Sequence, residues 1–97
     1  MLENFRSYQK ALELYKNSRG HRLPRFLKDQ LERAASSIVL NLAEGSGRAT
    51  KKDRMRFYVM AFASLREVQA IIDLEDSLVA LKAPADELGA HLYKLTH

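Results

Sequence analysis

The chain of 97 residues has no cysteine and no tryptophan, and only two prolines and four glycines. The absence of cysteine excludes disulfides and thiolate chemistry. No uncharged apolar run of the sequence approaches the roughly 18 residues that a membrane-spanning helix needs. The charged N-terminal segment also lacks the apolar stretch of a signal peptide. We therefore expect a single domain over residues 1–97, located in the cytoplasm and without a membrane partner.

Charge is divided unequally along the chain. Residues 1–56 hold thirteen Lys and Arg against six Asp and Glu, whereas residues 57–97 hold three against six. The net charge of +4 thus combines a basic front half with an acidic back half. Such asymmetry can attract an anionic partner such as nucleic acid, but it can equally attract helices or subunits to one another.

Apolar residues recur at helical spacing throughout, and no alternating strand pattern extends beyond a few residues. The predicted helices run from about residue 4 to 18, from Pro24 to just before Gly45, from Thr50 to about Val79, and from Pro84 onward. Thr50 and Asp53 have the spacing of a capping box. Four helices with short connections predict an all-α fold, an antiparallel four-helix bundle.

The faces of these helices predict both a core and a subunit contact. The first helix should bury Phe5, Tyr8, Leu12 and Tyr15, and the last should bury Leu88, Leu92 and Leu95. The core stripe expected on the second helix is Leu27, Leu31, Ala34, Ala35, Ile38 and Leu42. No charge occurs from residue 34 to residue 43, and Leu40 lies opposite the core stripe. A helix that is apolar or small all round is buried all round, so we expect a homo-oligomer.

Polar residues of the second helix align in one narrow stripe beside the core, at spacings of three and four. The stripe consists of Gln30, Arg33, Ser37, Asn41 and Glu44. An antiparallel return of the third helix would bring Ser64 near Arg33 and Glu67 near Gln30, so that Glu67 could pair with Arg33. One interpretation is a structural polar network that fixes helix or subunit register. The other is a catalytic site, with Glu44 as base or ligand, Asn41 as hydrogen-bond donor and Arg33 as anion clamp.

Catalysis and metal binding find little support in the residue pattern. Ser36, Ser37 and Ser64 have no histidine within helical reach that could activate them. Glu87 and His91 are spaced by four and occur once, whereas a di-iron bundle repeats Glu-x-x-His on two helices. We therefore favour the structural network over an enzyme, and we expect no metal and no cofactor.

A dense group of cations follows the second helix. Five cations fall within nine residues, with Asp53 the only opposing charge: Arg48, Lys51, Lys52, Arg54 and Arg56. They lie at a helix N-terminus, whose dipole also favours anions. The pattern predicts a surface that binds the phosphates of RNA or DNA, and an oligomer would repeat it. The alternatives are a solvated turn, or a protein-interaction scaffold whose basic face docks an acidic protein such as a nucleic-acid-processing enzyme.

The stretch from Gln30 to Gln69 resembles a bacterial four-helix bundle family encoded in intervening sequences of large-subunit ribosomal RNA genes and sometimes labelled S23 ribosomal proteins. The residues that carry the resemblance are Gln30, Arg33-Ala34, Ser37-Ile38, Asn41, Ala43-Glu44-Gly45, Arg48, Phe57, Ser64-Leu65 and Glu67. The resemblance implies a ring of subunits, with a pentamer as the expected size, and no enzymatic activity is established for the family. It also implies a relation in architecture to the accessory proteins of diversity-generating retroelements, which are basic barrels that bind nucleic acid and a reverse transcriptase.

Overall fold

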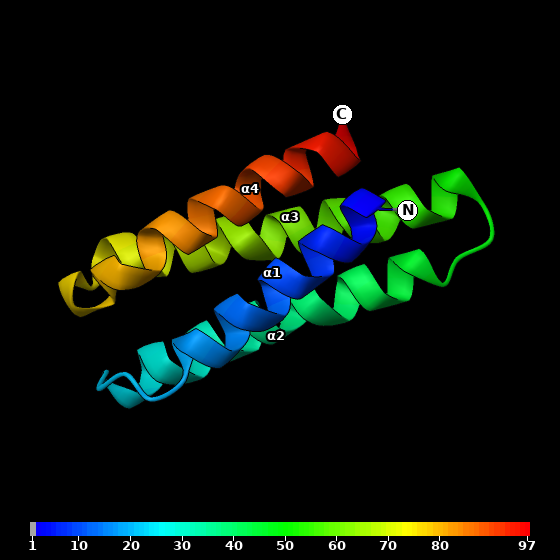
Figure 1. Ribbon diagram of the computed structural model, residues 1–97. Coiled ribbons are helices and arrows are strands. Elements are labelled where there is room, and N and C mark those ends of the chain that lie inside the picture. The colour runs from blue at the N-terminus through cyan, green and yellow to red at the C-terminus, as the bar shows by residue number, and fades with distance from the viewer. Residues whose placement is uncertain (1) are drawn as a thin grey trace.

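The computed structural model describes residues 2–97, which contain four α-helices and one 3-10 helix. The elements are α1 (Leu2–Ser18), α2 (Arg25–Ser46), α3 (Lys51–Leu74), the 3-10 helix η1 (Asp76–Leu81) and α4 (Lys82–Thr96) (Figure 1). No strand occurs among the described residues. The predicted all-α fold with four helices is confirmed.

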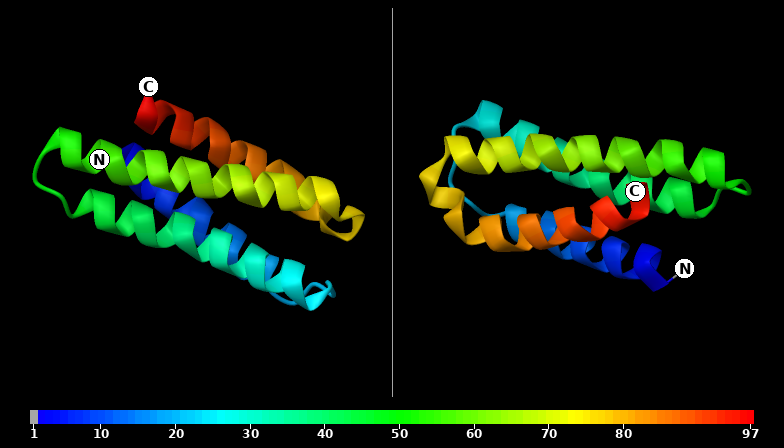
Figure 2. Two further views of the ribbon diagram at one scale, coloured as in Figure 1. Left: turned by 180° about the vertical axis from the view of Figure 1, so that it is seen from behind. Right: turned by 90° about the horizontal axis from the view of Figure 1, so that it is seen from above.

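Successive helices run antiparallel and form an elongated bundle of 40 × 21 × 18 Å. The long helices α2 and α3 lie side by side, and α1 and α4 lie together across one side of that pair (Figure 2). The α1–α2 turn and η1 are at one end of the bundle, and the α2–α3 turn is at the other. Within the described part of the chain, no helix has the length and apolarity needed to cross a bilayer.

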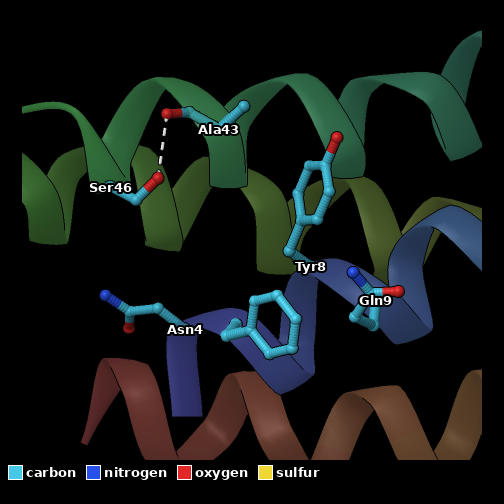
Figure 3. A pocket seen from close by; sticks show the side chains of 6 residues that line it. Asn4, Tyr8, Gln9, Ala43 and Ser46 are labelled. Atoms are coloured by element: carbon cyan, nitrogen blue, oxygen red, sulfur yellow. Dashed lines mark hydrogen bonds between the residues drawn. The ribbon is translucent and has the colours of Figure 1, made fainter. Parts of the chain in front are cut away.

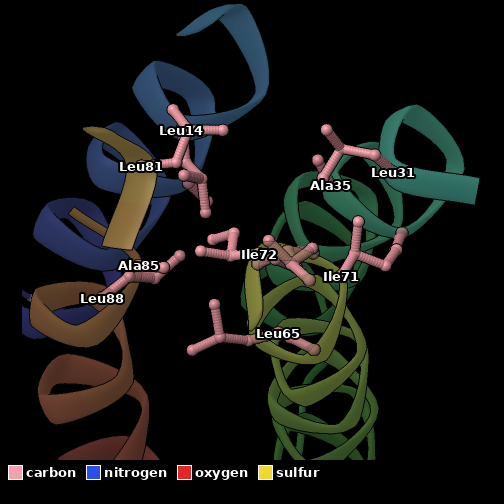
Figure 4. Packing of buried hydrophobic residues seen from close by; sticks show 14 of the residues in the cluster. Leu14, Leu31, Ala35, Leu65, Ile71, Ile72, Leu81, Ala85 and Leu88 are labelled. Atoms are coloured by element: carbon pink, nitrogen blue, oxygen red, sulfur yellow. The ribbon is translucent and has the colours of Figure 1, made fainter. Parts of the chain in front are cut away.

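The core lies along the axis between the four helices (Figure 4). Its largest fully buried apolar side chains are Leu14, Leu31, Ile38, Leu65, Val68, Leu78, Leu88 and Leu92. All six core residues predicted for α2 are buried, and so are Leu88 and Leu92 of α4, with Leu95 partly buried. Burial of these apolar surfaces is the main force that holds the helices together.

The predicted core face of α1 is wrong. Among residues 3–18 of this helix the buried ones are Ser7, Ala11, Leu14 and Ser18, whereas Phe5 is 60% exposed. Tyr8 and Tyr15 only flank the core. A choice based on the largest apolar side chains fails here because three of the four buried residues are small.

Two helix boundaries also differ from the prediction. The third helix ends at Leu74 and not near Val79, because Glu75 takes an extended conformation (φ −131°, ψ 105°). The 3-10 helix that follows turns Leu78 and Leu81 into the core. The fourth helix begins at Lys82, so Pro84 lies in its first turn, where a missing N–H breaks no helical hydrogen bond.

Candidate nucleic-acid interface

The α2–α3 turn is closed by backbone hydrogen bonds and a side-chain cap. The Gly47 N–H donates to the Glu44 carbonyl at 3.2 Å, and the Arg48 N–H donates to the Gly45 carbonyl at 3.1 Å. At the start of α3, the Thr50 hydroxyl accepts from the Asp53 N–H at 3.1 Å. The predicted cap by Thr50 is thereby confirmed.

Gly45 is inside α2, where the prediction placed it just beyond the helix end. The residue is buried, and a Cβ built on it would lie 2.8 Å from Cε1 of Tyr58 and 3.0 Å from Cβ of Phe57. The absence of a side chain therefore lets α2 and α3 approach closely beside the turn. The glycine is needed for packing, and the helix continues through it to Ser46.

Arg48 is only half exposed and already has partners within its own chain. Its Nη2 donates to Oε2 of Glu44 at 2.7 Å, and its guanidinium carbon lies 4.7 Å from the centroid of the Phe57 ring. Its Nε is buried without a hydrogen-bond partner in residues 2–97. The guanidinium carbon of Arg56 lies 5.0 Å from the same ring centroid. Phe57 thus anchors two cations by cation–π contact.

Arg54 also stabilises the turn. Its Nη1 donates to the carbonyls of Arg48 and Ala49, both at 3.2 Å. The side chains of Lys51, Lys52 and Arg56 are exposed and form no ion pair within the described residues. Of the five predicted cations, these three are the ones free to bind an external anion.

The polar stripe of α2 meets α3 through one compact hydrogen-bond group. Ser37 and Ser64 join through their Oγ atoms at 2.9 Å. The Asn41 Nδ2 donates to the Ser37 carbonyl at 2.9 Å and to the Ser37 Oγ at 3.1 Å. The stripe therefore bonds α3 through Ser37, which Asn41 holds from within α2, and Glu44 is paired separately to Arg48.

Gln30 and Arg33, the remaining residues of the stripe, are exposed, and so is Glu67 of α3. The expected ion pair between Arg33 and Glu67 does not occur among the ion pairs of residues 2–97. Ser64 was expected near Arg33 but bonds Ser37 instead. The Ser37–Ser64 bond therefore sets a register of α2 against α3 that differs from the expected one.

A second group of cations, which was not predicted from the sequence, surrounds the α1–α2 turn. Its members are Lys16, Arg19, Arg22, Arg25 and Lys28, all of them exposed. The available signal was the lack of any Asp or Glu from residue 14 to residue 28. A crevice of about 420 Å³ opens here, lined by Lys16, Arg19, Gly20, Lys28 and Glu32.

Ionisable groups with perturbed pKa values lie mostly away from both turns. The pKa of Glu3 is lowered, chiefly by its hydrogen bond with His91, and that of Glu87 is lowered by a hydrogen bond from Lys10. Both contacts join α1 to α4. Burial raises the pKa of Tyr58, the residue beside Gly45. No group of three or more metal-ligating side chains occurs in residues 2–97.

An apolar crevice of about 400 Å³ separates the start of α1 from the end of α2 (Figure 3). Its lining residues are Asn4, Phe5, Tyr8, Gln9, Ala43 and Ser46. Ala43 also lines the adjacent crevice formed with Leu40, Glu44, Gly47 and Arg48. Leu40 is 66% exposed. The two crevices together give the C-terminal half of α2 an exposed apolar surface.

The fold and these surfaces define a small antiparallel helical bundle with basic turns at both ends. The family described as 23S rRNA-intervening sequence protein matches residues 3–96, and the chain belongs to this family. The match extends the resemblance first seen in residues 30–69 to nearly the whole chain. No curated protein and no solved structure matches the chain.

Proposed function

We propose that the protein is a non-catalytic bundle that binds structured RNA or DNA through phosphate contacts. The observation that carries the proposal is the group of exposed cations at the start of α3, Lys51, Lys52 and Arg56, none of which has an ion-pair partner in the described chain. Phosphate contacts hold a nucleic acid without reading its bases. We therefore expect little sequence preference.

The five predicted cations divide into two roles in this proposal. Lys51, Lys52 and Arg56 face solvent and meet phosphate, while Arg48 and Arg54 hold the turn in shape and add to the positive potential. The N-terminal dipole of α3 favours an anion at the same place. Asp53 is the one acidic side chain among them, and its N–H is used by the Thr50 cap.

The hydrogen bonds of the polar stripe favour a structural role for it over a catalytic one. Glu44 bonds Arg48, and Asn41 bonds Ser37. The Glu44 carboxylate and the Asn41 amide are therefore bonded within the chain, whereas a catalytic site would need to present them to a substrate. Neither Ser37 nor Ser64 has a general base among its hydrogen-bond partners.

Self-association is the second part of the proposal, and it places the apolar surface of Leu40, Ala43, Phe5 and Tyr8 between copies of the chain. Phe5 and Leu40 are large apolar side chains with more than half of their surface exposed. Contiguous exposed apolar area of this kind marks contact surfaces. A ring of copies, with a pentamer as the expected size, would repeat the basic turn around its circumference and bind nucleic acid with avidity.

The binding proposal is tested with the triple variant Lys51→Gln/Lys52→Gln/Arg56→Gln and a labelled structured RNA. The matched control, Arg66→Gln/Lys82→Gln/Lys94→Gln, removes the same charge from the acidic back half of the chain. Fluorescence anisotropy should show weaker binding by the first variant to every sequence tried, and near wild-type binding by the control. Equal binding by both variants would contradict the proposal. Capture of one acidic protein that survives nuclease treatment, without nucleic-acid binding, would favour the scaffold alternative.

The self-association proposal is tested by light scattering at micromolar concentration. The wild type should be larger than an 11.1 kDa monomer. Leu40→Glu should reduce the size, because it places a charge in the apolar contact, whereas Val79→Glu, at an exposed apolar position of η1, should not. A monomeric wild type would overturn this part of the proposal.

A further inference from the structure

The α1–α2 turn holds five cations, more of them free than at the α2–α3 turn. Lys16, Arg19, Arg22, Arg25 and Lys28 are all exposed, and none appears in an ion pair within residues 2–97. The guanidinium carbon of Arg19 lies 5.9 Å from the Tyr15 ring centroid, a contact that keeps its N–H donors available.

The shape of this turn brings cations from two helices together. Gly20 has a φ of 88°, which lets the chain reverse sharply after α1. Lys16 and Arg19 on one side and Lys28 on the other then line a crevice of about 420 Å³. Glu32 also lines the crevice and offsets part of the charge, but the cations outnumber it. The crevice is thus an open, positively charged recess.

The two basic turns are separated by the length of α2. This helix has 22 residues, which at a rise of about 1.5 Å per residue gives about 33 Å. The turns lie at opposite ends of a molecule whose long dimension is 40 Å (Figure 1). Successive turns of a DNA double helix are about 34–36 Å apart along its axis. The separation of the two turns therefore matches one helical turn of a duplex.

We propose that the α1–α2 turn is a second phosphate-binding site and that the two turns together engage one nucleic-acid duplex at phosphates about one helical turn apart. This inference rests on the proposed function, and it names double-stranded nucleic acid at least one turn long as the preferred ligand class. The second contact becomes intramolecular once the first has formed, so a long duplex gains affinity that a short one cannot.

The test compares DNA duplexes of about 8 and about 20 base pairs by fluorescence anisotropy. Only the longer duplex exceeds the roughly 10 base pairs of a full turn. The variant is Lys16→Gln/Arg19→Gln/Lys28→Gln, and the control is again Arg66→Gln/Lys82→Gln/Lys94→Gln. Circular dichroism and light scattering establish that both keep the fold and assembly of the wild type.

The wild type should bind the long duplex more tightly than the short one, by more than the larger number of binding positions on the long duplex explains. The variant should lose at least about tenfold in affinity for the long duplex while keeping most of its affinity for the short one. Its salt slope on the long duplex should fall by roughly 2 to 3, at about 0.9 per lost phosphate contact. Unchanged binding of the long duplex by the variant would overturn the inference while leaving the α2–α3 interface intact. Failure of the wild type to bind either duplex or structured RNA would instead overturn the proposed function.

Discussion

The two basic turns carry the same number of cations but use them differently. At the α2–α3 turn, Arg48 pairs with Glu44 and stacks on Phe57, and Arg54 bonds two backbone carbonyls. At the α1–α2 turn, the cations face solvent, and the backbone is shaped by Gly20. Guanidinium groups offer several donors in a fixed plane, so they are readily used inside a turn. The density of charge in a sequence therefore overstates the charge that a ligand can reach.

The largest effect on stability should come from Gly45→Ala at the α2–α3 turn. The added Cβ would lie 2.8 Å from buried Tyr58 and 3.0 Å from Cβ of Phe57, which is fixed to the α3 backbone. Overpacking should exceed the gain in helix propensity and lower the free energy of unfolding by about 2 kcal/mol. Urea unfolding followed by circular dichroism measures it.

Gly47→Ala is the control for that variant. Its Cβ would have no neighbour closer than the Glu44 carbonyl at 3.6 Å, and its φ of −87° suits any residue. Stability should stay the same or rise by up to about 1 kcal/mol. Equal losses for both variants would show that Gly45 is not a packing glycine.

Gly20→Ala tests the other turn and should act through the backbone alone. A Cβ at Gly20 would meet nothing within 4 Å, but the φ of 88° is strained for an L-residue. We expect a loss of about 1 kcal/mol, and a smaller one for Gly20→Asn, since Asn tolerates this conformation better. The urea midpoints of the two variants give the comparison. Equal stability of Gly20→Ala and the wild type would refute the strain.

Comparing Arg54→Gln with Lys52→Gln should distinguish a cation that stabilises the turn from one that is free to bind a ligand. Loss of the bonds to the Arg48 and Ala49 carbonyls should lower the free energy of unfolding by roughly 0.5–1 kcal/mol. Lys52→Gln removes an exposed charge and should leave stability unchanged while weakening RNA binding. If thermal unfolding showed a loss of stability for Lys52→Gln and none for Arg54→Gln, Arg54 would not be the structural cation and Lys52 would not be the free one.

The smallest expected effect is on stability at acid pH. It arises at the α1–α4 contact and not at either turn. The hydrogen bond with His91 lowers the pKa of Glu3 below its usual 4.5. The unfolded chain then takes up a proton at higher pH than the folded one, so this stabilisation is complete above about pH 4.5 and is lost as the pH falls through the folded pKa. Glu3→Gln should flatten the acid side of the stability profile by less than about 1 kcal/mol. Identical profiles for Glu3→Gln and the wild type would contradict this.

The sequence predicted the elements better than the contacts between them. Helical periodicity and the Thr50 cap located four helices, and the core stripe of α2 was correct because its apolar residues are uninterrupted. Gly45 was misplaced because a glycine near a helix end fits both a terminator and a close approach. Only the position of Tyr58 and Phe57 decides between the two.

The location of the candidate interface could be predicted from the sequence, but which of its cations are free to bind a ligand could not. The run from Arg48 to Arg56 is evident in the sequence, yet the partners of Arg48 and Arg54 depend on how the turn folds. The α1–α2 cations are spread over thirteen residues and two helices, so their gathering depends on the reversal at Gly20. The Ser37–Ser64 bond, and the lack of an Arg33–Glu67 ion pair among the described residues, likewise depend on how α2 and α3 pack.

If exposed cations bind nucleic-acid phosphates, the affinity for nucleic acid must fall steeply as the salt concentration rises. The measurement is fluorescence anisotropy of a labelled structured RNA titrated with the wild-type protein at about 50 and about 200 mM salt. Three phosphate contacts alone predict an affinity loss of about 40-fold over this range, and more contacts predict a larger loss. Absence of binding at the lower salt, or binding that salt does not weaken, would contradict phosphate binding by these cations.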